Sequence, residues 1–123
     1  MDAATDKVNL AKKFTLFNEQ WTPKIVGELN GQLVKLAKVE GEFMRHAHDD
    51  EDELFLVVKG ALTIRLRDRD VHLNAGEFFI VPRGVEHLPI AEEEAHILLF
   101  EPKATAHTGK VQSERTVEQQ DWI

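Results

Sequence analysis

The 123-residue sequence contains no cysteine, which excludes disulfide bonds and thiolate metal ligands. It has no run of about eighteen apolar residues, so we predict no membrane-spanning helix. The first residues lack the apolar stretch of a secretory signal peptide, and we therefore expect a cytoplasmic protein. The length suits a single domain, residues 1–123, rather than two.

Positive charge is also scarce, with 15 Lys and Arg against 22 Asp and Glu and a net charge of −7. Such a balance opposes binding to phosphate backbones and to anionic membranes. The arginines at 65, 67 and 69 alternate along one predicted strand with aspartates nearby, a pattern typical of a solvated strand face. We expect neither a nucleic acid nor a membrane as partner.

Short apolar runs punctuated by Gly and Pro fill most of the chain. The Asn30–Gly31 pair is typical of a hairpin turn, and the near-helical apolar spacing in 6–17 predicts a short helix or turn. Many short strands with turns between them predict an all-β sandwich or barrel of roughly ten strands. The strands expected with most support are 33–39, 53–58, 61–67, 77–81 and 95–100.

Three histidines and a glutamate stand at a spacing that suits a metal site. His46 and His48 are two residues apart, so on a strand they point to the same face. Glu53 follows at an odd offset; a bulge or loop in the acidic stretch 49–52 must therefore reset the alternation. His87 follows a Pro-x-Gly turn that can aim it at the others. Imidazole and carboxylate suit Fe(II), Mn(II), Ni(II), Cu(II) or Zn(II).

The segments 41–60 and 76–91 resemble the two motifs of the cupin superfamily. The first motif, Gly-x5-His-x-His-x3–4-Glu-x6-Gly, is matched with one residue fewer after its first glycine. The second, Gly-x5-Pro-x-Gly-x2-His-x3-Asn, is matched with Ala91 in place of the Asn. The resemblance implies a double-stranded β-helix, the jelly-roll cupin barrel, with its core at about 24–102. It also implies one divalent transition metal (Fe, Mn, Ni, Cu or Zn) bound by His46, His48, Glu53 and His87.

The cupin metal site is shared by different reactions, so the fold does not determine the function. Four protein ligands leave one or two positions on the metal for water, dioxygen or a chelating substrate. The resemblance implies a metal-dependent enzyme acting on a small oxygen-rich molecule, as a dioxygenase, isomerase or lyase; hydrolysis is a further possibility. The alternative is a non-catalytic module that binds a metal or a small molecule. Small cupins are often labelled mannose-6-phosphate isomerase-like, but no phosphate-binding cluster is visible here.

Other side chains are expected around the metal site. Phe43, Phe55 and Phe79 are candidates for an apolar pocket above the metal, since pockets occur at the mouths of small barrels. His96 would contact the ligands only if its face of the last apolar strand lines the barrel. The histidines at 72 and 107 are predicted to be surface groups.

The strand 53–58 is apolar on both faces, so its outer face needs cover. Either the N-terminal segment or a second subunit can provide it, and the resemblance to cupins favours a homodimer. The apolar pair Trp122–Ile123 at the C-terminus is expected to dock on the barrel or on a partner.

Overall fold

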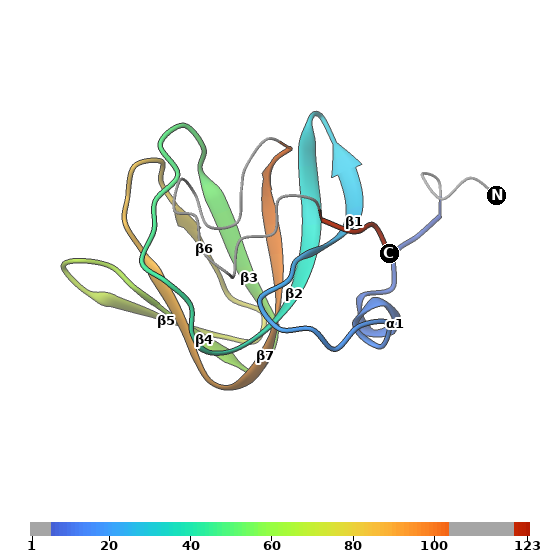
Figure 1. The fold of residues 1–123 in the computed structure, drawn as a ribbon, viewed down its shortest axis with the longest axis horizontal. Coiled ribbons are helices and arrows are strands. Elements are labelled where there is room, and N and C mark those ends of the chain that lie inside the picture. Colours follow the sequence, from blue (N-terminus) through green and yellow to red (C-terminus); the bar gives the residue numbers. More distant parts are fainter. Residues whose placement is uncertain (1–5, 104–119) are drawn as a thin grey trace.

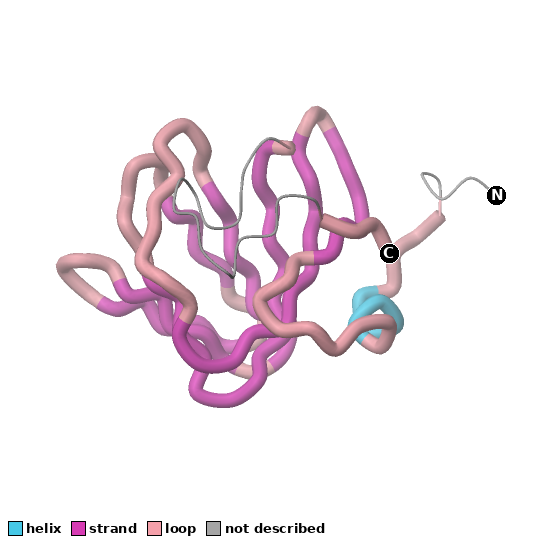
Figure 2. Tube along the Cα trace, viewed as in Figure 1, coloured by secondary structure: helices cyan, strands magenta, loops and turns pink. Residues whose placement is uncertain are grey.

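Antiparallel strands dominate the computed structural model, which describes residues 6–103 and 120–123 (Figures 1 and 2). One short helix precedes seven strands in this described part, and the predicted all-β class is confirmed. The elements are α1 (Leu10–Phe14), β1 (Lys24–Leu29), β2 (Gln32–Glu42), β3 (Glu53–Lys59), β4 (Ala61–Arg65), β5 (Asp70–Asn74), β6 (Phe78–Val81) and β7 (Leu88–Pro102).

The helix expected within 6–17 is a single turn and a half that starts at a capping residue. Asn9 is the N-cap, and its side-chain oxygen accepts a hydrogen bond from the Lys12 N–H at 3.1 Å, which satisfies a donor that the helix leaves free. Phe14 is buried against the barrel. Within the described ranges, no helix is long and apolar enough to cross a membrane.

The strands follow the order β1-β2-β7-β3-β6, and β4 pairs with both β5 and β7. The long strand β7 links the two layers, because its first residues pair with β4 and its remainder pairs with β2 and β3. This arrangement is the predicted jelly roll (Figure 1). The described part has seven strands rather than roughly ten, because β2 and β7 run for 11 and 15 residues where shorter strands were expected.

Alternation along the strands places one apolar face inside the barrel. Leu62 and Ile64 of β4 are buried, as their alternating pattern predicted. They pack with inward-facing side chains of β3 and β7, among them Phe55, Val57 and Ile97. Burial of these side chains supplies most of the apolar stabilisation of the barrel.

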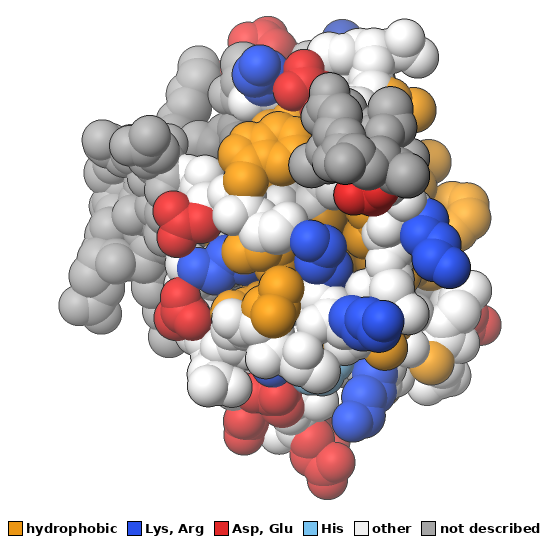
Figure 3. Space-filling view, turned by 90° about the vertical axis from the view of Figure 1, so that its right-hand side faces the viewer, with side chains coloured by type: hydrophobic (Ala, Val, Ile, Leu, Met, Phe, Trp, Pro, Cys, Tyr) orange, Lys and Arg blue, Asp and Glu red, His pale blue; other side chains and the backbone are white. Residues whose placement is uncertain are grey.

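A second apolar cluster lies outside the barrel, against side chains of β1, β2, β3 and β7. Phe14 and Phe17 from the N-terminal segment pack there with Val58 and Ile123. Ile123 is held by a backbone hydrogen bond to Ile25 at 3.0 Å, so this residue docks on the barrel, whereas the Trp122 side chain is 58% exposed. On the side that carries α1 and β1, hydrophobic side chains also show at the surface between charged groups (Figure 3).

Candidate metal centre

Two loops carry the three predicted histidine ligands. His46 and His48 lie in the loop between β2 and β3, and His87 lies in the loop between β6 and β7. The N–H groups of His46 and His87 each donate to the other's carbonyl, at 3.0 and 2.9 Å. The Gly84 N–H donates to the His48 carbonyl at 2.7 Å. These hydrogen bonds fix the loops side by side and bring distant parts of the sequence together.

The carboxylate reaches the site from the first residue of β3. Residues 49–52 are irregular, and this predicted break allows Glu53 to face the histidines despite its odd offset from them. Glu53 Oε1 lies 3.3 Å from Nε2 of His48 and 3.3 Å from Nε2 of His87. The four candidate ligand atoms, including one from His46, all lie within 4.8 Å of one another. The structure therefore brings together all four predicted residues, and all four are buried.

Backbone carbonyls orient two of the imidazoles. His46 Nδ1 lies 2.8 Å from the Met44 carbonyl, and His87 Nδ1 lies 3.0 Å from the Val85 carbonyl. A carbonyl only accepts hydrogen bonds, so each Nδ1 carries the proton and each Nε2 presents a lone pair. This is the arrangement in which a second group orients a metal-ligating histidine.

Four buried acceptor atoms converge without hydrogen-bond partners among the described residues: Nε2 of His46, His48 and His87, and Oε1 of Glu53. Buried polar atoms are nearly always paired, so a cluster of four orphans is unusual. A divalent cation between them would satisfy all four at once. Two ligand atoms that each lie about 2.1 Å from one ion, with an angle of about 90–110° at the ion, are about 3.0–3.4 Å apart. This agrees with the 3.3 Å separations between Glu53 Oε1 and the two Nε2 atoms.

The protonation states also suit a metal. Burial, followed by the charge of His87, lowers the pKa of His46 to about 4, so this imidazole is neutral at pH 7. Burial alone would raise the pKa of Glu53, but its interactions with Glu101, His48 and His87 lower it well below the usual value. Metal binding requires a neutral imidazole and an ionised carboxylate. The His/Glu group could therefore hold a divalent metal ion.

Two buried charged residues behind Glu53 were missed from the sequence. Lys35 Nζ pairs with Glu101 Oε1 at 2.8 Å, and the side chains are 2% and 0% exposed. Leu54 of β3 pairs with Phe100 of β7, and this register places Glu101 beside Glu53 on neighbouring strands. Burial, followed by the charge of Glu53, raises the pKa of Glu101 well above its usual value. Each residue interrupts the inward-facing apolar row of its strand, which was the signal available in the sequence.

The other histidines lie away from this centre. His96 stacks on Phe14 with ring centroids 4.5 Å apart, so it lies on the outer face of β7. The contact with the ligands that was expected if this face lined the barrel is therefore not made. His72 is exposed, as predicted, with its Nδ1 2.9 Å from Thr63 Oγ1. His107 lies outside the described residues.

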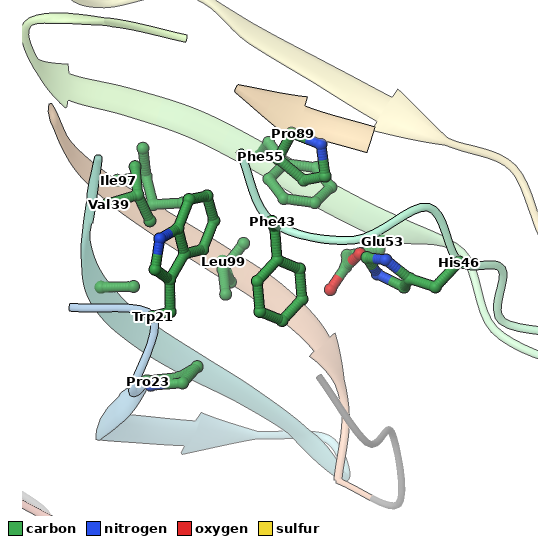
Figure 4. Close-up of a pocket in the computed structure, with 11 residues that line it drawn as sticks. Trp21, Pro23, Val39, Phe43, His46, Glu53, Phe55, Pro89, Ile97 and Leu99 are labelled. Carbon is green, nitrogen blue, oxygen red and sulfur yellow. The ribbon is translucent and has the colours of Figure 1, made fainter. Parts of the chain in front are cut away.

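A narrow apolar pocket ends at the candidate ligands (Figure 4). Its cavity volume is about 30 Å³, and the empty space reaches about 350 Å³ only when the open solvent is included. His46 and Glu53 are the polar side chains that line it, and Phe43 and Phe55 line it as predicted. Phe79 packs against the core instead, so its assignment to the pocket was wrong. The remaining lining residues are Trp21, Pro23, Ala37, Val39, Pro89, Ile97 and Leu99.

Trp21 is held in the pocket wall in a costly backbone conformation. Its φ of 58° lies in the left-handed region, which costs a bulky residue about 1–3 kcal/mol. Its backbone N–H donates to the Lys38 carbonyl at 2.8 Å, and its indole Nε1–H donates to the Glu40 carbonyl at 2.9 Å. The indole stacks on Phe43 at 4.7 Å, and Phe43 meets His46 edge-on at 5.5 Å. A stacked aromatic pair thus connects the pocket to the candidate ligands.

Comparison with known proteins agrees with the fold and the motifs. A family model described as "Cupin domain" matches residues 32–101, more than half of the chain. The chain is a cupin. The solved structure of a cupin-2 domain protein from Shewanella frigidimarina is 48% identical to this cupin, with a TM-score of 0.77. That match covers 78% of this chain and 94% of the other. The predicted family resemblance is confirmed.

Two curated proteins resemble this cupin over part of their length. The YdbB protein of Bacillus subtilis is 38% identical over 63 residues, which are 50% of this chain and 56% of YdbB. The 3-hydroxyanthranilate 3,4-dioxygenase of Xenopus laevis is 27% identical over 101 residues, which are 76% of this chain and 36% of that enzyme. The cupin thus matches little more than half of one relative and about a third of the other.

Proposed function

We propose that this cupin binds one divalent transition metal through His46, His48, Glu53 and His87, and acts as an enzyme on a small molecule in the adjoining pocket. The observation that carries the proposal is the convergence of four buried acceptor atoms with no hydrogen-bond partner among the described residues. When bound, the metal supplies Lewis acidity and, for a redox-active ion, electron transfer. The protein residues hold it and position the small molecule.

The pocket indicates the kind of molecule that fits. At its inner end, His46 and Glu53 mark the position where oxygen donors of a ligand would meet the metal, and the other walls are apolar. A molecule with one chelating end and an apolar body, such as an aryl group, matches this division. The stacked Trp21–Phe43 pair gives a flat surface for an aromatic body.

Among the reactions open to such a site, we favour oxygenation of the bound molecule. The similarity to 3-hydroxyanthranilate 3,4-dioxygenase covers 76% of this chain and includes the segments that carry the four candidate ligands. An apolar wall also keeps bulk water from the site. A cupin that only binds its small molecule, the alternative function, would use the same pocket without consuming dioxygen.

The proposal is tested by loading the protein with metal and then offering matched chelators. Chelator-stripped protein should take up one Fe(II), Mn(II), Ni(II), Cu(II) or Zn(II) ion per chain in equilibrium dialysis. The loaded protein should bind benzohydroxamate at least about tenfold tighter than acetohydroxamate, because the two share a chelating head and only the first buries a ring. In Trp21→Ala this preference should shrink. Absence of uptake with all five metals would overturn the metal site, and equal affinities would overturn the apolar-body ligand.

We also propose that the partner of this cupin is a second copy of the chain. β6 is the last strand of its sheet, and an edge strand offers unpaired backbone groups. Its side chains Phe78 and Ile80 are 59% and 47% exposed and lie beside Leu56 and Leu54 of β3. This apolar row at a sheet edge suits a self-complementary contact.

Sedimentation at micromolar concentration should give a mass of about 28 kDa, twice the 14.0 kDa of one chain. The variant Phe78→Lys should sediment as the monomer. A monomeric wild-type protein would contradict the proposed dimer.

A further inference from the structure

Lys38 of β2 carries a buried ammonium group on the outer face of the barrel. Its neighbours Ala37 and Val39 belong to the barrel core, so by alternation the Lys38 side chain points outward. Its Nζ donates to the Phe17 carbonyl at 2.7 Å and lies 5.1 Å from the centre of the Phe17 ring. Burying a charge is costly even when it has partners, and an apolar side chain would avoid that cost. Burial alone therefore gives no reason for a lysine here.

The same residue holds both ends of the segment 17–21. Its ammonium group contacts the start of the segment through the Phe17 carbonyl. Its backbone carbonyl accepts a hydrogen bond from the Trp21 N–H, at the end of the segment, at 2.8 Å. Between these two contacts, Gln20 forms a parallel β-bridge with Lys38. One residue of β2 thus fixes a segment that precedes the first strand.

Trp21, the last residue of this segment, is in a conformation that depends on such restraint. Its φ of 58° is strained for a bulky residue, and strained conformations persist only where the surrounding structure enforces them. The indole Nε1–H also donates to the Glu40 carbonyl at 2.9 Å. The ring lies beside Phe43 in the pocket (Figure 4). Strain that is maintained in this way is concentrated at functional sites.

We propose that Lys38 is a positioning residue, which holds Trp21 in the pocket wall and thereby sets the preference for a ligand with an apolar body. The inference rests on the proposed function for the nature of that ligand. Lys38 is not one of the residues that line the pocket, so its side chain acts on ligand choice through the segment 17–21.

Hydrogen exchange of the Trp21 indole N–H in metal-free protein tests the restraint without any ligand. In Lys38→Met, the side chain keeps its approximate length but loses its donor. Loss of a hydrogen bond from a charged group should speed this exchange about tenfold or more, because the segment opens more often. The substitution Trp122→Phe in every variant leaves Trp21 as the sole indole.

The matched control is Leu73→Ala, which weakens the barrel core. Leu73 is buried on β5, which pairs with β4 alone among the described strands. This variant should unfold at lower urea concentration but leave the Trp21 exchange unchanged. Unchanged exchange in Lys38→Met, or equal acceleration in Leu73→Ala, would overturn a local restraint by Lys38. If Lys38→Met does not fold, Lys38→Gln decides by the same criterion, because its amide nitrogen lies one bond nearer the backbone.

The ligand preference tests the role in the pocket. In Zn(II)-loaded protein, Lys38→Met should reduce the preference for benzohydroxamate over acetohydroxamate several-fold and leave the affinity for acetohydroxamate unchanged. In a Trp21→Ala background the same substitution should have no further effect, because the side chain that it positions is absent. An equal reduction with and without the indole would overturn the proposal.

The outcomes distinguish this inference from the proposed function. A wild-type protein that binds both hydroxamates equally would overturn the apolar-body ligand and, with it, the role of Lys38 in ligand choice. A wild-type protein that prefers benzohydroxamate, together with a Lys38→Met variant that keeps the full preference, would overturn only the role of Lys38.

Discussion

Replacing His87 with alanine is expected to weaken metal retention by at least about a hundredfold while leaving the barrel folded. The imidazole is fully buried, and its Nε2 faces Glu53 Oε1 at 3.3 Å. Its loss removes one of the four ligands. Metal affinity should therefore fall by more than the 10–100-fold that is typical when a group that only hydrogen-bonds a ligand is removed. The hydrogen bonds between residues 87 and 46 join backbone atoms and do not need the side chain. The two loops should therefore stay together.

The measurement is a chelator competition on wild-type and variant protein, with circular dichroism to confirm the β-rich fold. His72→Ala is the matched control, because it removes a histidine that is exposed and bonded to Thr63. The His72→Ala variant should retain wild-type metal affinity. If His87→Ala binds the metal as tightly as His72→Ala does, His87 is not a ligand.

The four candidate ligands could be found from the sequence because each stands at a fixed distance from a turn or a strand. His46 and His48 are two positions apart, which places both side chains on one side, and the irregular stretch 49–52 corrects the alternation for Glu53. His87 follows the turn at Gly84, which has a φ of 77°. Such short-range rules depend on local backbone geometry. The proximity of the two motifs came from the family resemblance.

Features that depend on strand order could not be read in the same way. The contact of Lys35 with Glu101 requires β7 to lie beside β2, and no local pattern specifies that pairing. Trp21 precedes the first strand and gives no periodic signal, yet it forms a pocket wall. Phe79 was assigned to the pocket by residue type alone. The described part has fewer strands than expected because the long strands β2 and β7 continue past positions where breaks were expected.

In metal-free protein, acid should reduce the free energy of unfolding through His46. Burial lowers the pKa of this imidazole from 6.5 to about 4 in the folded protein. The unfolded chain therefore binds the proton more readily between these values. The stabilisation is complete above pH 6.5, is lost as the pH falls toward 4, and changes no further below that. At about 1.4 kcal/mol for each tenfold change, the loss from this residue is about 3 kcal/mol.

The test compares urea unfolding at pH 7 and pH 4.5 for wild-type protein and His46→Asn, with a chelator present throughout. Asparagine cannot take up a proton, and its amide can still donate to the Met44 carbonyl that His46 Nδ1 contacts at 2.8 Å. The wild type should lose about 2–3 kcal/mol more than the variant over this range, and His72→Ala should lose as much as the wild type. Equal losses in wild type and His46→Asn would show that His46 is not held neutral by burial. The proposed metal site depends on a neutral His46 imidazole whose Nε2 lone pair faces the other candidate ligands, and that state would then lack its physical basis.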